Sequence, residues 1–240
     1  MIPGARPDLI LSSGFLAFGR HVGFLRGLEA AGVDFDAVVG TSSGSIVGAL
    51  YVAGHSPRAI EAMLEEFRRP ILKLRLHARP LHGVFSMRSL IAFLRPRLPA
   101  RIEDLPRPFA VGVMDADGRH RLLVDGPLPE AIAASSAVPR LFAPVRVGDA
   151  HYRDGGAVDR LGVAAWRKWR GPRDAIVHRV ARTLGAVTVD ELDDLVVVDS
   201  PPSGASLFSL GDVAAQIREG EARTKAALME AFADRVRAIA

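Results

Sequence analysis

Cysteine is absent from this chain of 240 residues. Disulfide bonds and thiolate metal sites are therefore excluded, and the absence fits a reducing compartment. The chain also lacks any run that approaches the roughly 20 consecutive apolar residues needed to span a bilayer. Residues 1–8 are a poor match to the start of a secretory signal peptide. We therefore expect a cytoplasmic protein that is not exported, with peripheral membrane attachment left open.

Acidic side chains are missing from residues 67–102, although the whole chain has 27 of them. The chain carries a net charge of +4 and this stretch alone contributes +9, so the remainder is net negative. Basic charge concentrated in one segment predicts a surface partner of opposite sign. The basic residues of the stretch are Arg68, Arg69, Lys73, Arg75, Arg79, Arg88, Arg95, Arg97 and Arg101.

Apolar residues lie between these arginines, which leaves two interpretations of residues 67–102. In the first, the stretch is ordinary core packing with solvated arginines. In the second, it forms a lid or rim that docks on a lipid or membrane surface with anionic headgroups. Nucleic acid is not expected as a partner, because the stretch lacks the tyrosine and tryptophan that stack on bases.

The pattern of apolar residues predicts an α/β fold with three layers and a mainly parallel central sheet. Short apolar runs, typical of buried strands, alternate with segments of helical periodicity. We expect strands at 9–11, 37–39, 109–113, 121–124, 145–147, 151–153, 176–177 and 195–198. We expect helices at 20–31, 43–54, 57–67, 86–94, 129–136, 162–169 and from 210 onwards, with Ser56 and Ser86 as caps. The length suits a single domain over residues 1–240.

The most informative motif is a Gly-x-Ser-x-Gly turn at Gly40, Ser42 and Gly44. It stands between an apolar strand and a helix, where such a turn presents a serine hydroxyl at the end of a sheet. The small flanking residues permit the sharp reversal of the backbone. Ser42 is therefore a candidate nucleophile. Only one expected strand, 9–11, precedes the strand at 37–39 that leads into this turn. In α/β-hydrolases several strands precede the serine turn, and the acid and then the histidine follow the serine along the chain, so the early position of Ser42 argues against that arrangement.

A serine nucleophile needs a base, and the sequence offers two kinds. His178 lies inside the apolar run at 176–178, so we expect it to be a core histidine. Asp154 follows an expected strand and precedes Gly155 and Gly156, which permit a tight turn that places the carboxylate at the strand end. On the turn alone, an ordinary Asp-Gly turn like the one at Asp117 is the simpler interpretation.

The serine motif at 40–44, the segment 134–145 and the aspartate motif at 154–156 follow one another along the chain. Together with two flanking matches, they resemble the patatin-like phospholipase family over about residues 9–169. The resemblance implies a Ser-Asp dyad in which Ser42 is the nucleophile and Asp154 the base, without histidine. It also implies no metal or organic cofactor, and residues 170–240 would complete the same domain. The two flanking matches are 21–25 and 29–33.

The chain departs from this family in the loop that would hold the oxyanion. The family has a glycine-rich loop there, and the resemblance implies an oxyanion hole at Ser13, Gly14 and Phe15. Only Gly14 remains of the glycine set, and the family's basic residue is replaced by Ala17. Because Phe15 and Phe18 tolerate positive φ poorly, we expect either a reshaped loop or phenylalanines that line the acyl site.

The expected function is a lipid acyl hydrolase of the phospholipase A or lysophospholipase type. It would cleave fatty-acyl esters through an acyl-Ser42 intermediate. Two alternatives stay open at this point. One is a catalytically impaired protein of the same fold that binds lipid or regulates. The other is a Ser-His-Asp esterase that uses a histidine such as His178. The choice of headgroup and the oligomeric state are not determined by the sequence.

Overall fold

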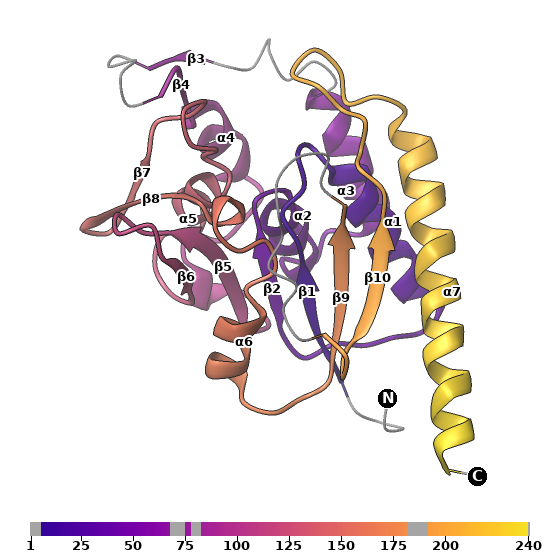
Figure 1. Ribbon diagram of the computed structural model, residues 1–240. Coiled ribbons are helices and arrows are strands. Elements are labelled where there is room, and N and C mark those ends of the chain that lie inside the picture. Colours follow the sequence, from indigo (N-terminus) through magenta and orange to yellow (C-terminus); the bar gives the residue numbers. More distant parts are fainter. Residues whose placement is uncertain (1–5, 68–74, 78–82, 182–191, 240) are drawn as a thin grey trace.

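The structure is a computed structural model that describes residues 6–67, 75–77, 83–181 and 192–239 (Figure 1). Its strands are β1 (Asp8–Leu11), β2 (Val38–Thr41), β3 (Arg75–Leu76), β4 (Phe85–Ser86), β5 (Phe109–Met114), β6 (His120–Leu123), β7 (Val145–Val147), β8 (Ala150–Asp154), β9 (Ala175–Val180) and β10 (Val196–Ser200). Its α-helices are α1 (Phe18–Ala30), α2 (Ser43–Val52), α3 (Pro57–Leu64), α4 (Arg88–Leu94), α5 (Leu128–Ser135), α6 (Val163–Arg170) and α7 (Val213–Ile239).

In the described part of the chain, the central sheet has eight strands in the order β10-β9-β1-β2-β5-β8-β7, with β6 also paired to β5. The five strands from β10 to β5 are parallel, and β6, β7 and β8 join in antiparallel fashion. The expected mainly parallel sheet is therefore confirmed. The arrowheads of β9 and β10 point towards the end of the molecule where β3 and β4 lie (Figure 1). Ligands of open parallel sheets bind at this carboxyl end.

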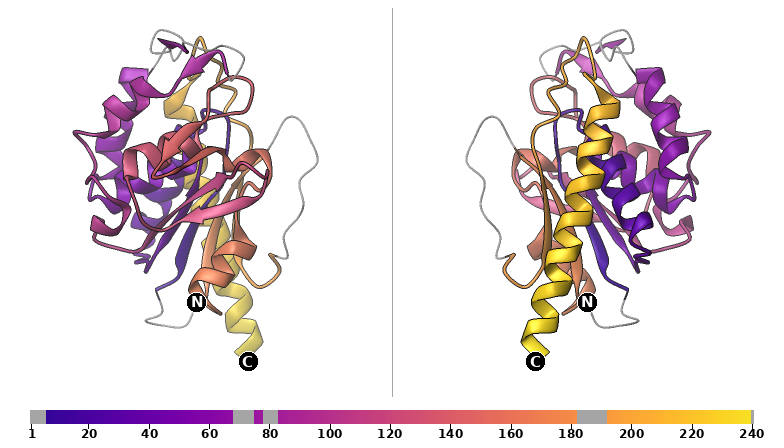
Figure 2. Two further views of the ribbon diagram at one scale, coloured as in Figure 1. Left: turned by 90° about the vertical axis from the view of Figure 1, so that its left-hand side faces the viewer. Right: turned by 90° about the vertical axis from the view of Figure 1, so that its right-hand side faces the viewer.

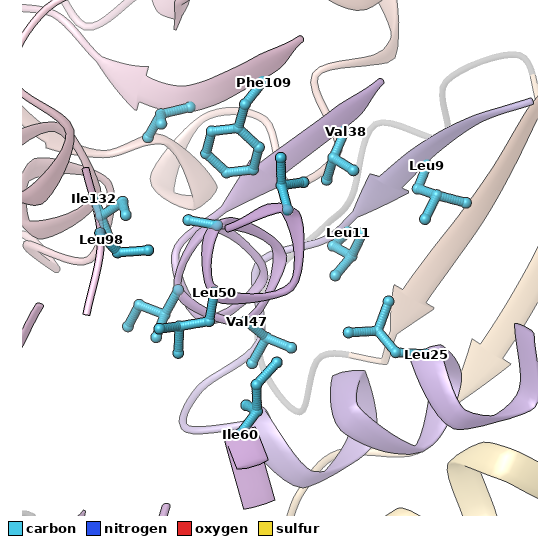
Figure 3. Close-up of a cluster of buried hydrophobic side chains, with 14 of the residues drawn as sticks. Leu9, Leu11, Leu25, Val38, Val47, Leu50, Ile60, Leu98, Phe109 and Ile132 are labelled. Carbon is cyan, nitrogen blue, oxygen red and sulfur yellow. The ribbon is translucent and has the colours of Figure 1, made fainter. Parts of the chain in front are cut away.

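Alternate residues of the central strands enter two separate cores, which is why the sheet is covered on both faces. Leu9, Leu11 and Val38 pack into the larger core, with residues of α1, α2, α3, α5 and α7 (Figure 3). Ile10 and Val39 face the other way and pack into a smaller core with α6. Figure 2 shows the sheet between these two layers. The three-layer expectation is thus confirmed.

Helix α7 runs the length of α1 at very close range (Figure 2). Glycines at positions 19, 23 and 27 of α1 face it, and a Cβ added at Gly23 would lie 2.3 Å from the Ile217 carbonyl oxygen. The buried Arg20 guanidinium also forms an ion pair with Glu219. The segment after residue 170 therefore contributes β9 and β10 to the sheet and covers α1 with α7.

The acid-free segment differs from expectation where it is described. Ser86 lies in β4 rather than capping a helix; α4 follows Met87, which makes no side-chain cap bond. Strands β3 and β4 form a small hairpin that the sequence did not predict. Arg68, Arg69, Lys73 and Arg79 lie outside the described residues. No helix in the described part of the chain is long and apolar enough to cross a membrane.

Candidate active site

Ser42 occupies a strained turn between β2 and α2. Its backbone has φ 53° and ψ −120°, which is unusual for any residue other than glycine. The Ser42 N–H donates to Ser135 Oγ at 2.7 Å, and Ser135 Oγ in turn donates to the Gly112 carbonyl at 2.6 Å. Ser45 Oγ donates to the Ser42 carbonyl at 2.7 Å. Both polar backbone groups of Ser42 are therefore held in place by neighbouring serines.

The flanking glycines are required by close packing, as the motif predicted. A Cβ on Gly40 would lie 2.6 Å from the Ser45 Cα. A Cβ on Gly44 would lie 2.3 Å from the Leu11 carbonyl oxygen of the neighbouring strand. Real Cβ atoms do not approach other atoms this closely, so larger residues would displace the turn that carries Ser42.

Asp154 is brought beside this turn by the pairing of β5. At Gly112 and Val113, β6 takes one edge of β5, so β2 and β8 share the other edge. Thr41 lies opposite Gly112 and Asp154 opposite Val113. Successive residues of a strand are about 3.3 Å apart. The residue that precedes Ser42 and the carboxylate at the end of β8 therefore sit at adjacent positions on one edge.

The Asp154 side chain is almost entirely buried, with 5% of its surface exposed. The Gly156 N–H donates to its Oδ1 at 2.8 Å, which fixes one carboxylate oxygen. Gly155 passes so close to β5 that a Cβ there would lie 2.7 Å from the Gly112 carbonyl. A Cβ on Gly156 would lie 2.3 Å from Ser13 Oγ, so both glycines after Asp154 are required by close packing. This is more than an ordinary Asp-Gly turn demands.

Ser42 and Asp154 line one cavity of about 1030 Å³. Much of its remaining wall is apolar, and it includes Phe18, Ile46, Met87, Leu90, Val138 and Phe142. A large apolar cavity with a few convergent polar groups is the usual form of a small-molecule site. No histidine lines it within the described residues. The described ranges also hold no cluster of three or more acidic or histidine side chains suited to a metal ion.

The expected oxyanion loop also lines this cavity, but its three residues differ in what their N–H groups do. The Ser13 N–H donates to the Arg160 carbonyl at 2.9 Å. Within the described residues, the N–H groups of Gly14 and Phe15 have no such acceptor. Leu16 takes a positive φ of 50°, whereas Phe15 and Phe18 do not. Phe15 and Phe18 both line the cavity.

The buried Arg160 side chain supports this loop. Its Nη2 donates to the Ser13 carbonyl at 2.8 Å and also to the Val180 carbonyl, and its Nε donates to Ser13 Oγ at 3.3 Å. Arg160 follows the Asp154 turn by six residues. It therefore ties the loop to the segment that carries the carboxylate and to the end of β9. It also places a cation in the cavity wall.

His178 is a core histidine, as expected. It is fully buried, its Nδ1 lies 2.8 Å from His21 Nδ1, and its Nε2 lies 2.9 Å from Ser200 Oγ. Its ring also stacks on Phe24 at 4.7 Å. Burial lowers the pKa of His178 well below its usual value and that of His21 to about 3, so both rings are neutral. Because both nitrogens of His178 contact other groups, the structure gives it no place as a base for Ser42.

Backbone strain is concentrated at the cavity. Within the described part of the chain, three residues other than glycine have positive φ: Leu16, Ser42 and Arg140. All three line the cavity. Strained conformations cluster at functional sites because the surrounding structure must hold them against a cost of about 1–3 kcal/mol each. This concentration supports the assignment of the cavity as the functional site.

The comparison with known families agrees with this geometry. The sequence model described as patatin-like phospholipase matches residues 9–165, well over half of the chain. The chain belongs to the patatin-like phospholipase family. The resemblance seen in the sequence motifs is thereby confirmed. The matched region contains Ser42, Asp154 and most of the cavity wall.

Relatives within the patatin-like family are mostly much longer proteins. An uncharacterized NTE family protein of Mycobacterium tuberculosis is 30% identical over 161 residues, which are 66% of this chain and 45% of that protein. Patatin-like phospholipase domain-containing protein 6 of Mus musculus is 30% identical over 207 residues, which are 80% of this chain and 14% of that protein. This chain therefore spans less than half the length of these relatives.

Solved structures share the patatin-like fold. VipD from Legionella pneumophila superposes with a TM-score of 0.62 at 12% identity and covers 94% of this chain and 67% of its own. ExoU, in its complex with SpcU from Pseudomonas aeruginosa, gives 0.52 at 17% identity and covers 94% and 52%. At these identities the likeness concerns the fold alone.

The sequence analysis did not identify three residues that hold or line the site: Ser135, Arg140 and Arg160. Ser135 and Arg140 stand inside the segment 134–145 that resembles the family, so that resemblance was the signal available for them. Arg160 had no local signal, because its partners Ser13 and Val180 are distant in the sequence. Sequence patterns report spacing along the chain and not contacts between distant segments.

Proposed function

We propose that the protein is a lipid acyl hydrolase in which Ser42 and Asp154 act as a catalytic dyad. Patatin-like phospholipases are lipid hydrolases as a family, which supplies the general class of reaction. The observation that carries the finer proposal is the pairing on β5, which brings the strained Ser42 turn and the buried Asp154 carboxylate to one edge and one cavity. The apolar wall suits a fatty-acyl chain.

In the proposed reaction, Asp154 accepts the proton of the Ser42 hydroxyl while Oγ attacks the acyl carbonyl carbon. The tetrahedral intermediate collapses, the alcohol leaves with the proton from Asp154, and the acyl group remains on Ser42. Water then attacks the acyl-serine and gives its proton to Asp154. The second intermediate releases the fatty acid and returns the proton to Ser42. Each step transfers one proton, so Asp154 ends as it began.

The oxyanion that forms in both steps needs donors placed in advance. The N–H groups of Gly14 and Phe15 fit this role, since both residues line the cavity and neither amide has an acceptor among the described residues. The N-terminus of α2 begins beside Ser42 and adds the positive end of its dipole. This arrangement supports catalysis despite the loss of glycines from the loop.

The dyad is tested with p-nitrophenyl butyrate and palmitate as substrates. We expect Ser42→Ala and Asp154→Asn each to lower kcat by roughly a thousandfold or more, because the nucleophile or its base is lost. A fluorophosphonate probe should label wild type but not Ser42→Ala. The matched controls are Ser56→Ala, which removes an exposed helix cap, and Asp117→Asn, which alters an exposed Asp-Gly turn. Both should retain the wild-type rate.

The result of this assay also separates the alternatives. If Asp154→Asn keeps the full rate, the dyad is wrong. If the correctly folded wild type has no activity and takes up no probe but still binds lipid, the protein is instead a catalytically impaired lipid-binding member of the family. The esterase that uses His178 has no support in the structure, since that histidine contacts His21 and Ser200.

We also propose that the protein meets its substrate at an anionic lipid surface. Large apolar side chains are exposed on the β3–β4 hairpin and on loops that line the cavity: Leu76, Val84 and Phe15 are 77%, 42% and 51% exposed. Arg75 and Arg88 lie there too and form no ion pair within the described residues. By contrast, Arg95, Arg97 and Arg101 of the same acid-free segment pair with glutamates.

A further inference from the structure

Arg140 stands in the cavity wall on a turn that does not suit it. The Leu141 N–H donates to the Val138 carbonyl at 3.2 Å, which closes a four-residue turn with Pro139 and Arg140 at its centre. Proline is favoured at the first central position of such a turn. Arg140 occupies the second with φ 70°, where glycine is the favoured residue. The chain therefore has a long cationic side chain at a position where the backbone conformation favours glycine.

The strain is maintained by the surroundings of the turn. Strand β4 is hydrogen-bonded to the segment that follows the turn. The Phe85 N–H donates to the Leu141 carbonyl, and the Ala143 N–H donates to the Phe85 carbonyl, both at 2.9 Å. Phe142 packs against Phe85 with ring centroids 6.2 Å apart. Strain that is held by neighbouring contacts and lies at a cavity points to a function for the strained residue.

Among the described residues, the charges of the cavity wall leave one cation, Arg140, available for a ligand. Its charged lining residues are Arg140, Asp154 and Arg160. Arg160 is buried and donates to two carbonyls and to Ser13, and Asp154 is buried as well. Arg140 is exposed and forms no ion pair within the described residues. A guanidinium in this position offers a planar pair of donors, which suits phosphate.

We propose that Arg140 binds the phosphate of the substrate, so that the cavity prefers acyl esters that carry a phosphate over neutral esters. This inference rests on the proposed function for the reaction itself, because it names the substrate class of the same site. The acyl chain would lie along the apolar wall while the phosphate stays at the exposed Arg140. The backbone strain is then the cost of placing a cation at this point of the wall.

Binding is measured first, because it does not depend on turnover. The probes are dodecyl phosphate, dodecanol and inorganic phosphate, titrated as monomers into the full chain by calorimetry. We expect wild type to bind dodecyl phosphate about 10–100-fold more tightly than dodecanol, as a hydrogen bond to a charged group allows. Arg140→Gln and Arg140→Gly should abolish this preference, and Arg140→Lys should keep part of it. Arg58→Gln, an exposed arginine of α3 outside the cavity wall, is the matched control and should bind as wild type.

Arg140→Gly distinguishes an arginine kept for binding from one kept for stability. Glycine relieves the positive φ, so this variant should unfold at a Tm about 2–4 °C higher than wild type while it loses the phosphate preference. Higher stability together with lost discrimination would show that the arginine is retained for binding. A variant with unchanged discrimination would overturn the proposal, whatever its stability.

Kinetics then connect binding with substrate choice. With lauroyl lysophosphatidic acid and monolauroylglycerol as substrates, Arg140→Gln should lower kcat/KM at least tenfold for the first and less than twofold for the second. Equal losses on both substrates would contradict the proposal. Inorganic phosphate should not compete with dodecyl phosphate; if it competes equally well, the site takes free phosphate and the lipid assignment is wrong. If no ester is hydrolysed but the binding preference holds, the proposed reaction fails while the phosphate site stands.

Discussion

At the scale of single residues, the site depends on side chains that hold the Ser42 backbone. Ser135 Oγ accepts a hydrogen bond from the Ser42 N–H and donates one to the Gly112 carbonyl, so it connects the turn to β5. Ser135 is fully buried, so its hydroxyl is shielded from bulk solvent. The unfavourable φ of Ser42 is thus held by the hydrogen bond that its N–H donates to Ser135, the last residue of the sequence-distant helix α5.

Ser135→Ala should therefore slow catalysis more than it weakens substrate binding. The Ser42 N–H would be left buried without an acceptor, at a cost of about 1–3 kcal/mol, and the turn would relax. We expect kcat to fall about tenfold with KM nearly unchanged, since displaced reacting groups lose rate. Steady-state kinetics with a p-nitrophenyl ester measure this split.

The control for Ser135→Ala is Ser56→Ala, which removes the hydrogen bond from Ser56 Oγ to the Ala59 N–H at the start of α3. It should cost a similar amount of stability, about 1 kcal/mol, without any change in kcat. If both variants lose activity in proportion to their stability, Ser135 has no special role in placing Ser42.

At the scale of elements, the rim of the cavity is built from short pieces that come from different parts of the chain. The β3–β4 hairpin is fixed to the segment 141–143 by the hydrogen bonds of Phe85. The loop between β1 and α1 carries Phe15, and a loop before α7 carries Phe208, which is 72% exposed. Neighbours of Phe15 and Phe208 in both loops line the same cavity.

Vesicle flotation tests whether the β3–β4 hairpin docks on lipid. We expect wild type to float with vesicles that contain phosphatidylglycerol and much less with phosphatidylcholine alone, because apolar area and basic charge act together. The double variant Arg75→Ser, Leu76→Ser should reduce binding to anionic vesicles about tenfold.

The matched control for the hairpin variant is Arg58→Ser, Phe232→Ser, which removes one exposed arginine of α3 and one exposed phenylalanine of α7. It should float as wild type does. Equal binding of both double variants, or equal flotation with the two kinds of vesicle, would contradict a specific role for the hairpin.

At the scale of the whole molecule, two buried histidines link the sheet to the layer of helices. His21 of α1 and His178 of β9 share a hydrogen bond, and each also contacts a serine, Ser43 and Ser200 respectively. Since the two Nδ1 atoms face each other, one must donate and the other accept, so the two rings cannot both be protonated. Burial together with the charges of Arg160 and Arg20 disfavours their protonation.

The fold should therefore lose stability in mild acid. The pKa of His21 is about 3 in the folded protein and that of His178 is also lowered, whereas unfolded histidines titrate near 6.5. Below pH 6.5 the unfolded chain binds protons that the folded chain does not, so the free energy of unfolding falls as pH falls. For His21 we expect the loss to approach about 1.4 kcal/mol per pH unit below pH 6.5, and His178 should add to it in the same direction.

Urea unfolding at several pH values measures this slope. His151→Gln, which changes an exposed histidine of β8, should leave the slope unchanged. A free energy of unfolding that stays constant from pH 7 to 5 would mean that the two rings are not held neutral in the folded state.

The sequence by itself determined the local parts of this protein. The turn at Ser42, the glycines after Asp154 and the alternation of strands with helices could all be predicted, because each depends on the conformational limits of neighbouring residues. The expected cap at Ser86 was wrong because β4 is paired with β3 and bonded to the segment 141–143, which overrides the local preference.

Only the tertiary structure decided how these parts meet. The edge of β5 brings Asp154 beside the Ser42 turn, Ser135 holds that turn, and Arg160 supports the loop opposite. The same packing keeps Arg140 in a conformation that an isolated segment would leave. These contacts join residues that are dozens of positions apart, and burial makes them strong because water cannot compete for the same hydrogen bonds. No local pattern encodes them, since they exist only when the sheet and its helices have assembled.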